Sequence, residues 1–217
     1  MIYGVTLLPD AETIERMLHF AHKVTAASSS AISCVSADAI PHLSLVHAES
    51  NTDEAGRWWH EVARSITANF SATLTGLMFS PLPVGDYYVP EGGIYFGLEV
   101  LRSAALYNAH HEVLEIASRV GAVPVGAIGD NFRPHITLGI LREFPSTRLI
   151  LPSDITAASI QCTVAFGQIR RYGQLGPDFG TTTTADFLSP ELGDRTRRNE
   201  DPCPALPQTY YRHPAHS

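Results

Sequence analysis

The sequence is poor in cysteine and contains no long apolar run. Its three cysteines, Cys34, Cys162 and Cys203, are too few and too widely spaced for a disulfide framework or a zinc cluster, so we expect a reducing compartment and no metal site. No apolar run reaches the about 18 residues of a membrane span, and the N-terminus lacks the basic segment and cleavage site of a secretory signal. We therefore expect a cytoplasmic protein with no membrane partner.

Positive charge is also scarce. Fifteen lysines and arginines stand against 22 aspartates and glutamates, which gives a formal net charge of -7 at pH 7. This balance argues against a protein that grips long duplex nucleic acid through many phosphate contacts. A small nucleotide or an RNA end fits better as a substrate. The 217 residues suffice for one substantial core or two small lobes, and we expect the chain to fold alone as a monomer.

Several familiar catalytic motifs are missing, and a repeated short motif is present instead. The sequence has no lipase elbow, no Walker loop and no carboxylate cluster for magnesium. It does contain Pro41-His42-Leu43-Ser44-Leu45 and Pro134-His135-Ile136-Thr137-Leu138. Because successive side chains of a strand point to opposite faces, each copy predicts a strand with an imidazole and a hydroxyl on one face and Leu43 or Ile136 in a core.

The repetition extends beyond the motifs. The motif histidines, at 42 and 135, are 93 residues apart. The same offset lays the strand predicted at 2–8 on the strand predicted at 94–100, with Gly4 on Gly97. It also superposes the helices predicted at 11–26 and 103–120. Both halves therefore follow the order strand, helix, short strand and motif strand, which predicts an internal duplication.

This duplication predicts an α+β fold. We expect a two-lobed domain over residues 1–188, with pseudo-repeats at about 1–80 and 93–170. Each lobe would hold an antiparallel sheet with helices on its outer face, the lobes would be related by a pseudo-two-fold axis, and the active-site cleft would lie between them. A parallel doubly wound sheet ranks second because no glycine-rich turn follows the first strand of either half. Residues 189–217 have no apolar period, so we expect a flexible or surface tail.

The two motifs together favour phosphodiester chemistry. Two imidazoles beside one bound group can act as a base and an acid near neutral pH. We therefore predict that His42 and His135 are catalytic. Ser44 and Thr137 are good neutral donors to phosphate oxygens, which favours a phosphate-binding role for them. This set of groups suits attack on a phosphodiester without a metal.

The motifs also resemble a known family. Pro41-His42-Leu43-Ser44-Leu45 and Phe132-Arg133-Pro134-His135-Ile136-Thr137-Leu138 are similar to the paired His-x-Ser/Thr motifs of the two-histidine (2H) phosphoesterases, and most similar to the bacterial RNA 2′,5′-ligases and 2′,3′-cyclic phosphodiesterases. The resemblance implies a bilobal duplicated fold and an enzyme that opens 2′,3′-cyclic phosphates to 2′-phosphates without a cofactor, with RNA 2′,5′-ligation in the reverse direction. It assigns catalysis to the two histidines and phosphate binding to the two hydroxyls.

Two positions depart from that branch. Ser44 stands where threonine is commoner, which is a mild change. Ile140 stands where the branch usually has an arginine, and Arg142 shares its face by strand parity, so Arg142 is a candidate substitute. Tyr88, Phe132 and Arg133 are further candidates to stack on or steer a base. Two alternatives stay open from the sequence: a non-catalytic protein that binds nucleotides or RNA ends, and a 2H enzyme that acts on another cyclic nucleotide or phosphoester.

Overall fold

The structure is a computed structural model that describes residues 1–27, 30–144, 152, 155 and 158–182. The tail predicted at 189–217 lies outside the described residues. Within the described part, no helix combines the length and the apolar character needed to cross a bilayer.

The elements follow the predicted order closely. The first half comprises β1 (Ile2–Pro9), α1 (Ala11–Ala26), β2 (Ile32–Ser33), β3 (Leu43–Glu49), α2 (Thr52–Ser65) and β4 (Asn69–Leu82). The second half comprises β5 (Gly93–Val100), α3 (Ala104–Val120), β6 (Val123–Val125), β7 (His135–Leu141), β8 (Ser159–Ile169) and β9 (Leu175–Thr181). The sequence did not predict β9, because Gly176-Pro177-Asp178 lacks the apolar period of a strand.

Local signals set the helix ends. The side chain of Asp10 accepts a hydrogen bond from the backbone of the first turn of α1. Asn51 and Glu54 form a reciprocal capping box on α2, and Ser103 caps α3. Gly121 ends α3 with a φ of 92°, a left-handed conformation that glycine adopts without steric cost.

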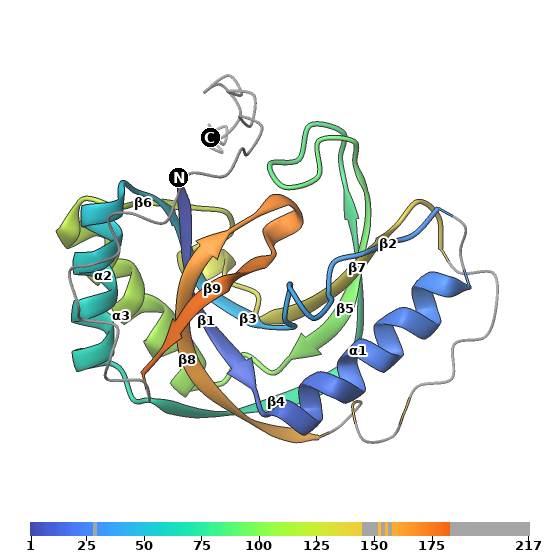
Figure 1. The fold of residues 1–217 in the computed structure, drawn as a ribbon, viewed down its shortest axis with the longest axis horizontal. Coiled ribbons are helices and arrows are strands. Elements are labelled where there is room, and N and C mark those ends of the chain that lie inside the picture. The colour runs from blue at the N-terminus through green and yellow to red at the C-terminus, as the bar shows by residue number, and fades with distance from the viewer. Residues whose placement is uncertain (28–29, 145–151, 153–154, 156–157, 183–217) are drawn as a thin grey trace, which may run out of the picture. The chain divides into compact units, whose positions relative to one another are not determined.

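Every strand pairing that the described residues form is antiparallel, so the fold is α+β and the parallel doubly wound alternative is wrong. The sheet runs in the order β2-β7-β5-β4-β8-β1-β3-β6, with β9 on β8. The long strand β4 joins the two lobes, because residues 69–73 pair with β8 and residues 74–82 pair with β5. The lobes are thus halves of one continuous sheet (Figure 1).

One more pairing closes the sheet on itself. Leu43 of β3 is the register partner of Ile136 of β7. The strands β3, β7, β5, β4, β8 and β1 therefore form a ring in which the two motif strands are neighbours. Both paired side chains are fully buried in the main hydrophobic cluster.

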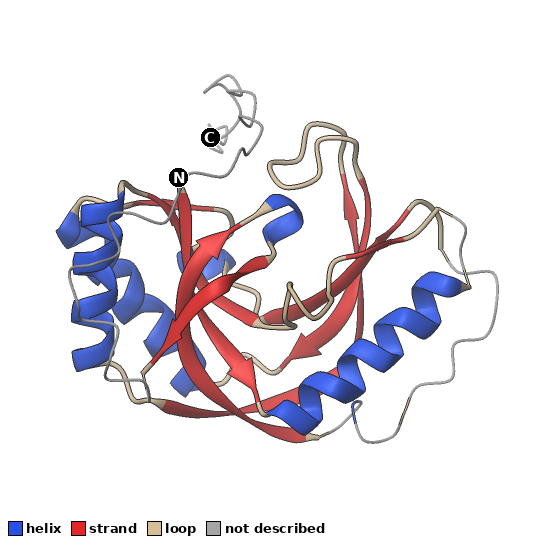
Figure 2. Cartoon of the chain, viewed as in Figure 1, coloured by secondary structure: helices blue, strands red, loops and turns tan. Residues whose placement is uncertain are grey.

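The helices cover the outer faces of the sheet (Figure 2), and α1 and α3 each cover the motif strand of the other half. Helix α1 follows β1 in the chain, yet it packs against β2 and β7 of the other lobe. Helix α3 follows β5 but packs against β3, β6 and α2. The predicted bilobal, duplicated arrangement is confirmed, with each half supplying the helix that covers the motif strand of the other.

The repeat register differs from the predicted one in the first strands. Ser44 pairs with Thr6, and its counterpart Thr137 pairs with Gly97. Gly97 is therefore equivalent to Thr6, and placing Gly4 on Gly97 was wrong. The connection between β5 and α3 is two residues longer than the connection between β1 and α1, which shifts the first strands by two residues against the motif strands.

Gly97 allows the close approach of the two central strands of the second lobe, β5 and β7. A Cβ atom at this position would overlap the backbone carbonyl oxygen of Ile136. We expect Gly97→Ala to lower the free energy of unfolding by about 1–3 kcal/mol because the backbone must shift. Gly56→Ala is the matched control, since a Cβ there meets open space on α2 and should raise the stability by about 0.5–1 kcal/mol. Urea denaturation followed by circular dichroism measures both, and a Gly97→Ala variant as stable as the parent would contradict the argument.

Candidate active site

The motif strands carry their histidines and hydroxyls on one face. Leu43 and Ile136 point into the core, so the residues on either side of each project from the opposite, helix-free face. Continuing the antiparallel register places His42 across from Thr137 and Ser44 across from His135. The two histidines are then diagonal neighbours, and such neighbours are about 7–8 Å apart. The structure thus brings all four predicted residues together, while their roles stay predictions.

Each histidine is oriented by the backbone two residues before it. Nδ1 of His42 lies 2.9 Å from the carbonyl oxygen of Ile40, and Nδ1 of His135 lies 2.7 Å from that of Arg133. A carbonyl oxygen only accepts hydrogen bonds, so both Nδ1 atoms carry the proton. Both neutral rings therefore present Nε2 as the atom that gains or loses a proton, and the two halves repeat the same geometry.

Burial makes both histidines readier to lose a proton. It lowers the pKa of His42, the charge of His135 lowers that pKa further, and hydrogen bonding to the backbone of Ile40 and Gly173 opposes the shift. Burial likewise lowers the pKa of His135, against the hydrogen bond to Arg133 and the charge of Glu99. In the free protein both rings favour the neutral form near pH 7, and a bound anion would favour protonation of either.

A third histidine, His47, reaches the same face, and the sequence analysis missed it. Thr6 pairs with Ser44, and Gly4 pairs with His47, two residues back along β1. A β-bulge at Leu45 inserts one residue between them, so His47 lies on the face of Ser44 although it is three residues away. Strict alternation would have placed it on the other face. Motif spacing alone carried no signal for it.

The bulge recurs in the second lobe. The register of β7 skips Leu138, so Ile140 shares the face of Thr137 as His47 shares the face of Ser44. A bulge leaves a backbone carbonyl without a ladder partner, and here each one is satisfied. Nδ1 of the buried His110 lies 2.7 Å from the carbonyl oxygen of Leu45, and the backbone N–H of Cys34 donates to that of Leu138 at 3.0 Å. Both bulges are therefore built into the fold.

The predicted residue Tyr88 reaches the site through His47. Its hydroxyl lies 2.6 Å from Nδ1 of His47, and the two rings meet edge to face. Tyr88 also packs, with Tyr95 and Tyr172, against a small apolar cluster that contains Ile140. The face beside the histidines is therefore polar in the first lobe and aromatic in the second.

A tight hairpin between β8 and β9 approaches His42. Tyr172 at its tip has a φ of 62°, which is strained for a residue with a side chain, and the backbone of the next residue, Gly173, lies close enough to His42 to oppose the lowering of its pKa. Glu91 holds the hairpin, accepting hydrogen bonds from the Tyr172 hydroxyl at 3.2 Å and from Arg171 at 3.4 Å. These contacts with Glu91 hold the hairpin, and with it the strained backbone of Tyr172, in place.

Arg142 is tied to the same glutamate. Its guanidinium donates to the carbonyl oxygen of Gly92 at 2.9 Å and lies 3.6 Å from Glu91. Ile140, at the position where the resemblance leads one to expect an arginine, is fully buried. Arg142 therefore braces the loop beside the site, and the structure gives no support to its predicted role as a substitute.

Phe132 and Arg133 differ in what they offer a substrate. The ring of Phe132 is only 5% exposed and stacks on His110, with centroids 4.1 Å apart, so the structure gives it a packing role and does not support base stacking. Arg133 is exposed and forms an ion pair with Glu99 at 2.8 Å. Its carbonyl oxygen orients His135, while a substrate contact by its side chain stays a prediction.

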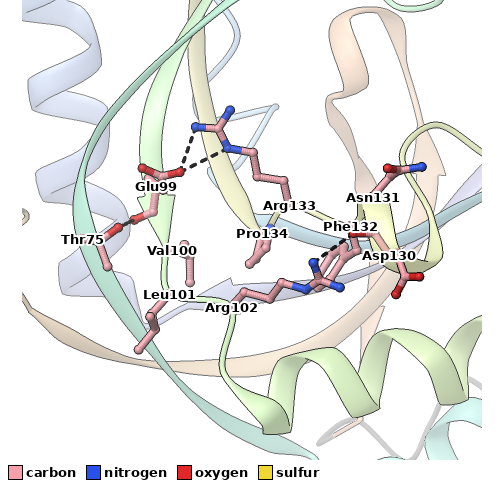
Figure 3. A pocket seen from close by; sticks show the side chains of 10 residues that line it. All are labelled: Thr75, Glu99, Val100, Leu101, Arg102, Asp130, Asn131, Phe132, Arg133 and Pro134. Carbon is pink, nitrogen blue, oxygen red and sulfur yellow. Dashed lines mark hydrogen bonds and ion pairs between the residues drawn. The ribbon is translucent and has the colours of Figure 1, made fainter.

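A pocket of about 390 Å³ adjoins the second motif. Figure 3 shows Arg133 bonded to Glu99 on one wall and Arg102 bonded to the backbone of Asp130 on another. The residues that line it are Thr75, Glu99, Val100, Leu101, Arg102, Asp130, Asn131, Phe132, Arg133 and Pro134. The two motif histidines lie outside this set. Across the described ranges, no group of three or more histidine, cysteine, aspartate or glutamate side chains is arranged to hold a metal ion.

Solved structures share this fold. No protein-family model and no curated protein sequence matches the chain. LigT of E. coli is similar in its apo form with 17% identity and a TM-score of 0.50, over 83% of this chain and 93% of that one. LigT complexed with 3′-AMP has 15% identity and a TM-score of 0.50, over 82% and 93% of the two chains. The protein TT0787 of Thermus thermophilus has 14% identity and a TM-score of 0.51, over 83% and 94%. The chain therefore shares the fold of LigT and TT0787, which agrees with the expected fold.

His47 should make the stability depend on pH. Burial, reinforced by the charges of His42 and His135, lowers the pKa of His47 to about 3. An unfolded chain binds a proton near pH 6.5, whereas the folded chain resists it, so stability is full above about pH 6.5 and is lost as the pH falls toward 3, by at most about 1.4 kcal/mol per pH unit for this group. We expect His47→Asn to flatten this slope. Urea denaturation at pH 7.5, 6.0 and 4.5 measures it, and parallel slopes in the two proteins would refute the assignment.

Proposed function

We propose that this chain is a phosphodiesterase that opens the 2′,3′-cyclic phosphates of RNA ends or small nucleotides to 2′-phosphates. The observation that carries the proposal is the pair of histidines, His42 and His135. Each is fixed by its own backbone, and they present Nε2 from neighbouring strands on one face. The 2H fold and the complex of LigT with 3′-AMP support a nucleotide phosphoester as the substrate.

We propose a separate role for each histidine. We assign the general base to His135 and the general acid to His42, because the backbone of Ile40 and Gly173 beside His42 opposes the lowering of its pKa by burial. His135 Nε2 takes a proton from water as the water oxygen attacks phosphorus. The bond from phosphorus to the ribose O3′ breaks, and His42 gives its Nε2 proton to that oxygen. The products carry a 2′-phosphate and a 3′-hydroxyl.

Ser44 and Thr137 complete the phosphate site. Each hydroxyl lies on the face of the histidines, across the strand pair from the imidazole of the other motif. A hydroxyl is a neutral donor, so it stabilises charge that builds on the non-bridging phosphate oxygens without competing for the catalytic proton. An RNA 5′-hydroxyl that attacks in place of water would give the 2′,5′-linkage expected from the resemblance. The expected monomeric state, cytoplasmic location and lack of a cofactor stay predictions.

The proposal predicts turnover that depends on both histidines. The purified protein should hydrolyse a nucleoside 2′,3′-cyclic phosphate in EDTA, with the 2′-phosphate as the product. His42→Ala and His135→Ala should each lower kcat by about 10²–10⁴, the range of a single acid or base. His60→Ala is the control, because His60 is exposed on α2 and should leave kcat unchanged. Chromatography of the products measures both the rate and the position of cleavage.

The same preparation distinguishes the alternatives. Full activity in either motif variant would contradict the two-histidine mechanism. Thermal stabilisation by the nucleotide without turnover would identify a binding protein. Turnover of cyclic dinucleotides or other phosphoesters, with none of the 2′,3′-cyclic phosphate, would keep the chemistry and replace the substrate.

A further inference from the structure

His47 has no role in the two-histidine mechanism, yet the fold gives it a built position. The bulge at Leu45 turns it to the face of Ser44, and its strand partner is Gly4. A Cβ atom at Gly4 would lie 2.8 Å from Cδ2 of His47, so the ring rests directly on the glycine backbone. The registers of β1 with β3 and of β3 with β7 put His47 on the face that carries Ser44 and both motif histidines.

The hydroxyl of Tyr88 is the hydrogen-bond partner of Nδ1 in this ring. Its hydroxyl is largely buried and needs an acceptor for its proton, and Nδ1 of His47 lies 2.6 Å away. If the hydroxyl donates to Nδ1, the proton of the neutral imidazole resides on Nε2. This is the reverse of His42 and His135, whose Nδ1 atoms donate to carbonyl oxygens. In that arrangement His47 presents a donor at Nε2, where the other two histidines present an acceptor.

That donor is buried and unsatisfied. Nε2 of His47 has no hydrogen-bond partner among the described residues. A buried donor without a partner is costly, and such atoms in folded proteins usually have a role that explains them. A neutral N–H donor beside two imidazoles is suited to an oxyanion, because it can bind the oxygen without giving up a proton at the working pH.

We propose that His47 is a substrate-binding residue whose Nε2–H donates to a non-bridging oxygen of the bound phosphate, and that Tyr88 is the residue that positions it. The identity of the phosphate rests on the function proposed above; the oxyanion site itself does not. The second lobe has the buried Ile140 at the equivalent position. Besides the hydroxyls of Ser44 and Thr137, the phosphate therefore receives a third side-chain donor from the first lobe only.

Two substitutions of His47 distinguish the contributions of its two ring nitrogens. The side-chain amide of asparagine mimics Nδ1, whereas that of glutamine reaches the place of Nε2. We expect His47→Asn to raise KM for a 2′,3′-cyclic nucleotide by about 10–100-fold with a smaller change in kcat, the loss of one hydrogen bond to a charged group. His47→Gln should stay within about 3-fold of the parent. His60→Asn on the exposed face of α2 is the matched control and should not change either constant.

Tyr88→Phe tests the positioning role. Removing the hydroxyl releases the tautomer, so KM should rise, and combining it with His47→Asn should add little, because both act through one hydrogen bond. Nitrogen-15 NMR of the imidazoles gives a readout that a packing role would not move. Nε2 of His47 should be protonated in the parent, and adding 2′-AMP should shift its N–H resonance.

Calorimetric titration with 2′-AMP separates this proposal from the proposed function. If the parent shows no turnover but binds 2′-AMP, and His47→Asn weakens that binding while His47→Gln does not, the phosphodiesterase assignment falls and the role of His47 stands. If the parent turns over and His47→Asn matches it, the role of His47 falls alone. The proposed role of His47 is also contradicted if His47→Gln and His47→Asn lose activity equally and both lose thermal stability. An absence of both turnover and binding overturns both proposals.

Discussion

The arrangement of the site depends on one contact between the two lobes, the pairing of Leu43 with Ile136. Because both side chains fill the core, their neighbours must point to the other face, and the antiparallel register sets His42 beside His135. The same pairing closes the ring of strands, so the spacing of the histidines is fixed by the backbone of the whole sheet.

The features that follow from local pattern could be predicted. A histidine and a hydroxyl two residues apart, each between buried aliphatic residues, placed His42, Ser44, His135 and Thr137 on strands with the correct faces. The helices were predicted because capping residues and a C-terminal glycine, Gly121, mark their ends. The duplication explained why the motif occurs twice, and it also led to the correct fold class.

The features that depend on long-range geometry could not be predicted. The alternation of side chains along β3 predicts the wrong face for His47, because a bulge at Leu45 interrupts it. That bulge is stabilised by His110, which lies 65 residues away in the chain. The equivalence of Gly97 with Thr6 depends on the connection between β5 and α3 being longer than the one between β1 and α1, and neither connection carries a periodic signal. Arg142 has the right parity, but Glu91 and Gly92 take up its guanidinium. In each case a distant contact decides what the local pattern leaves open.

The exchange of helices has a consequence for how such a chain holds together. Helix α1 shields the motif strand of the second half, and α3 shields that of the first, so neither half can bury its own sheet. A separated half would expose an apolar sheet face and an apolar helix face at once. It could cover both only by pairing with a second copy of itself, as in a domain-swapped dimer. The chain thus resembles a domain-swapped homodimer joined into one polypeptide, and its two halves differ at the equivalent positions of His47 and Ile140.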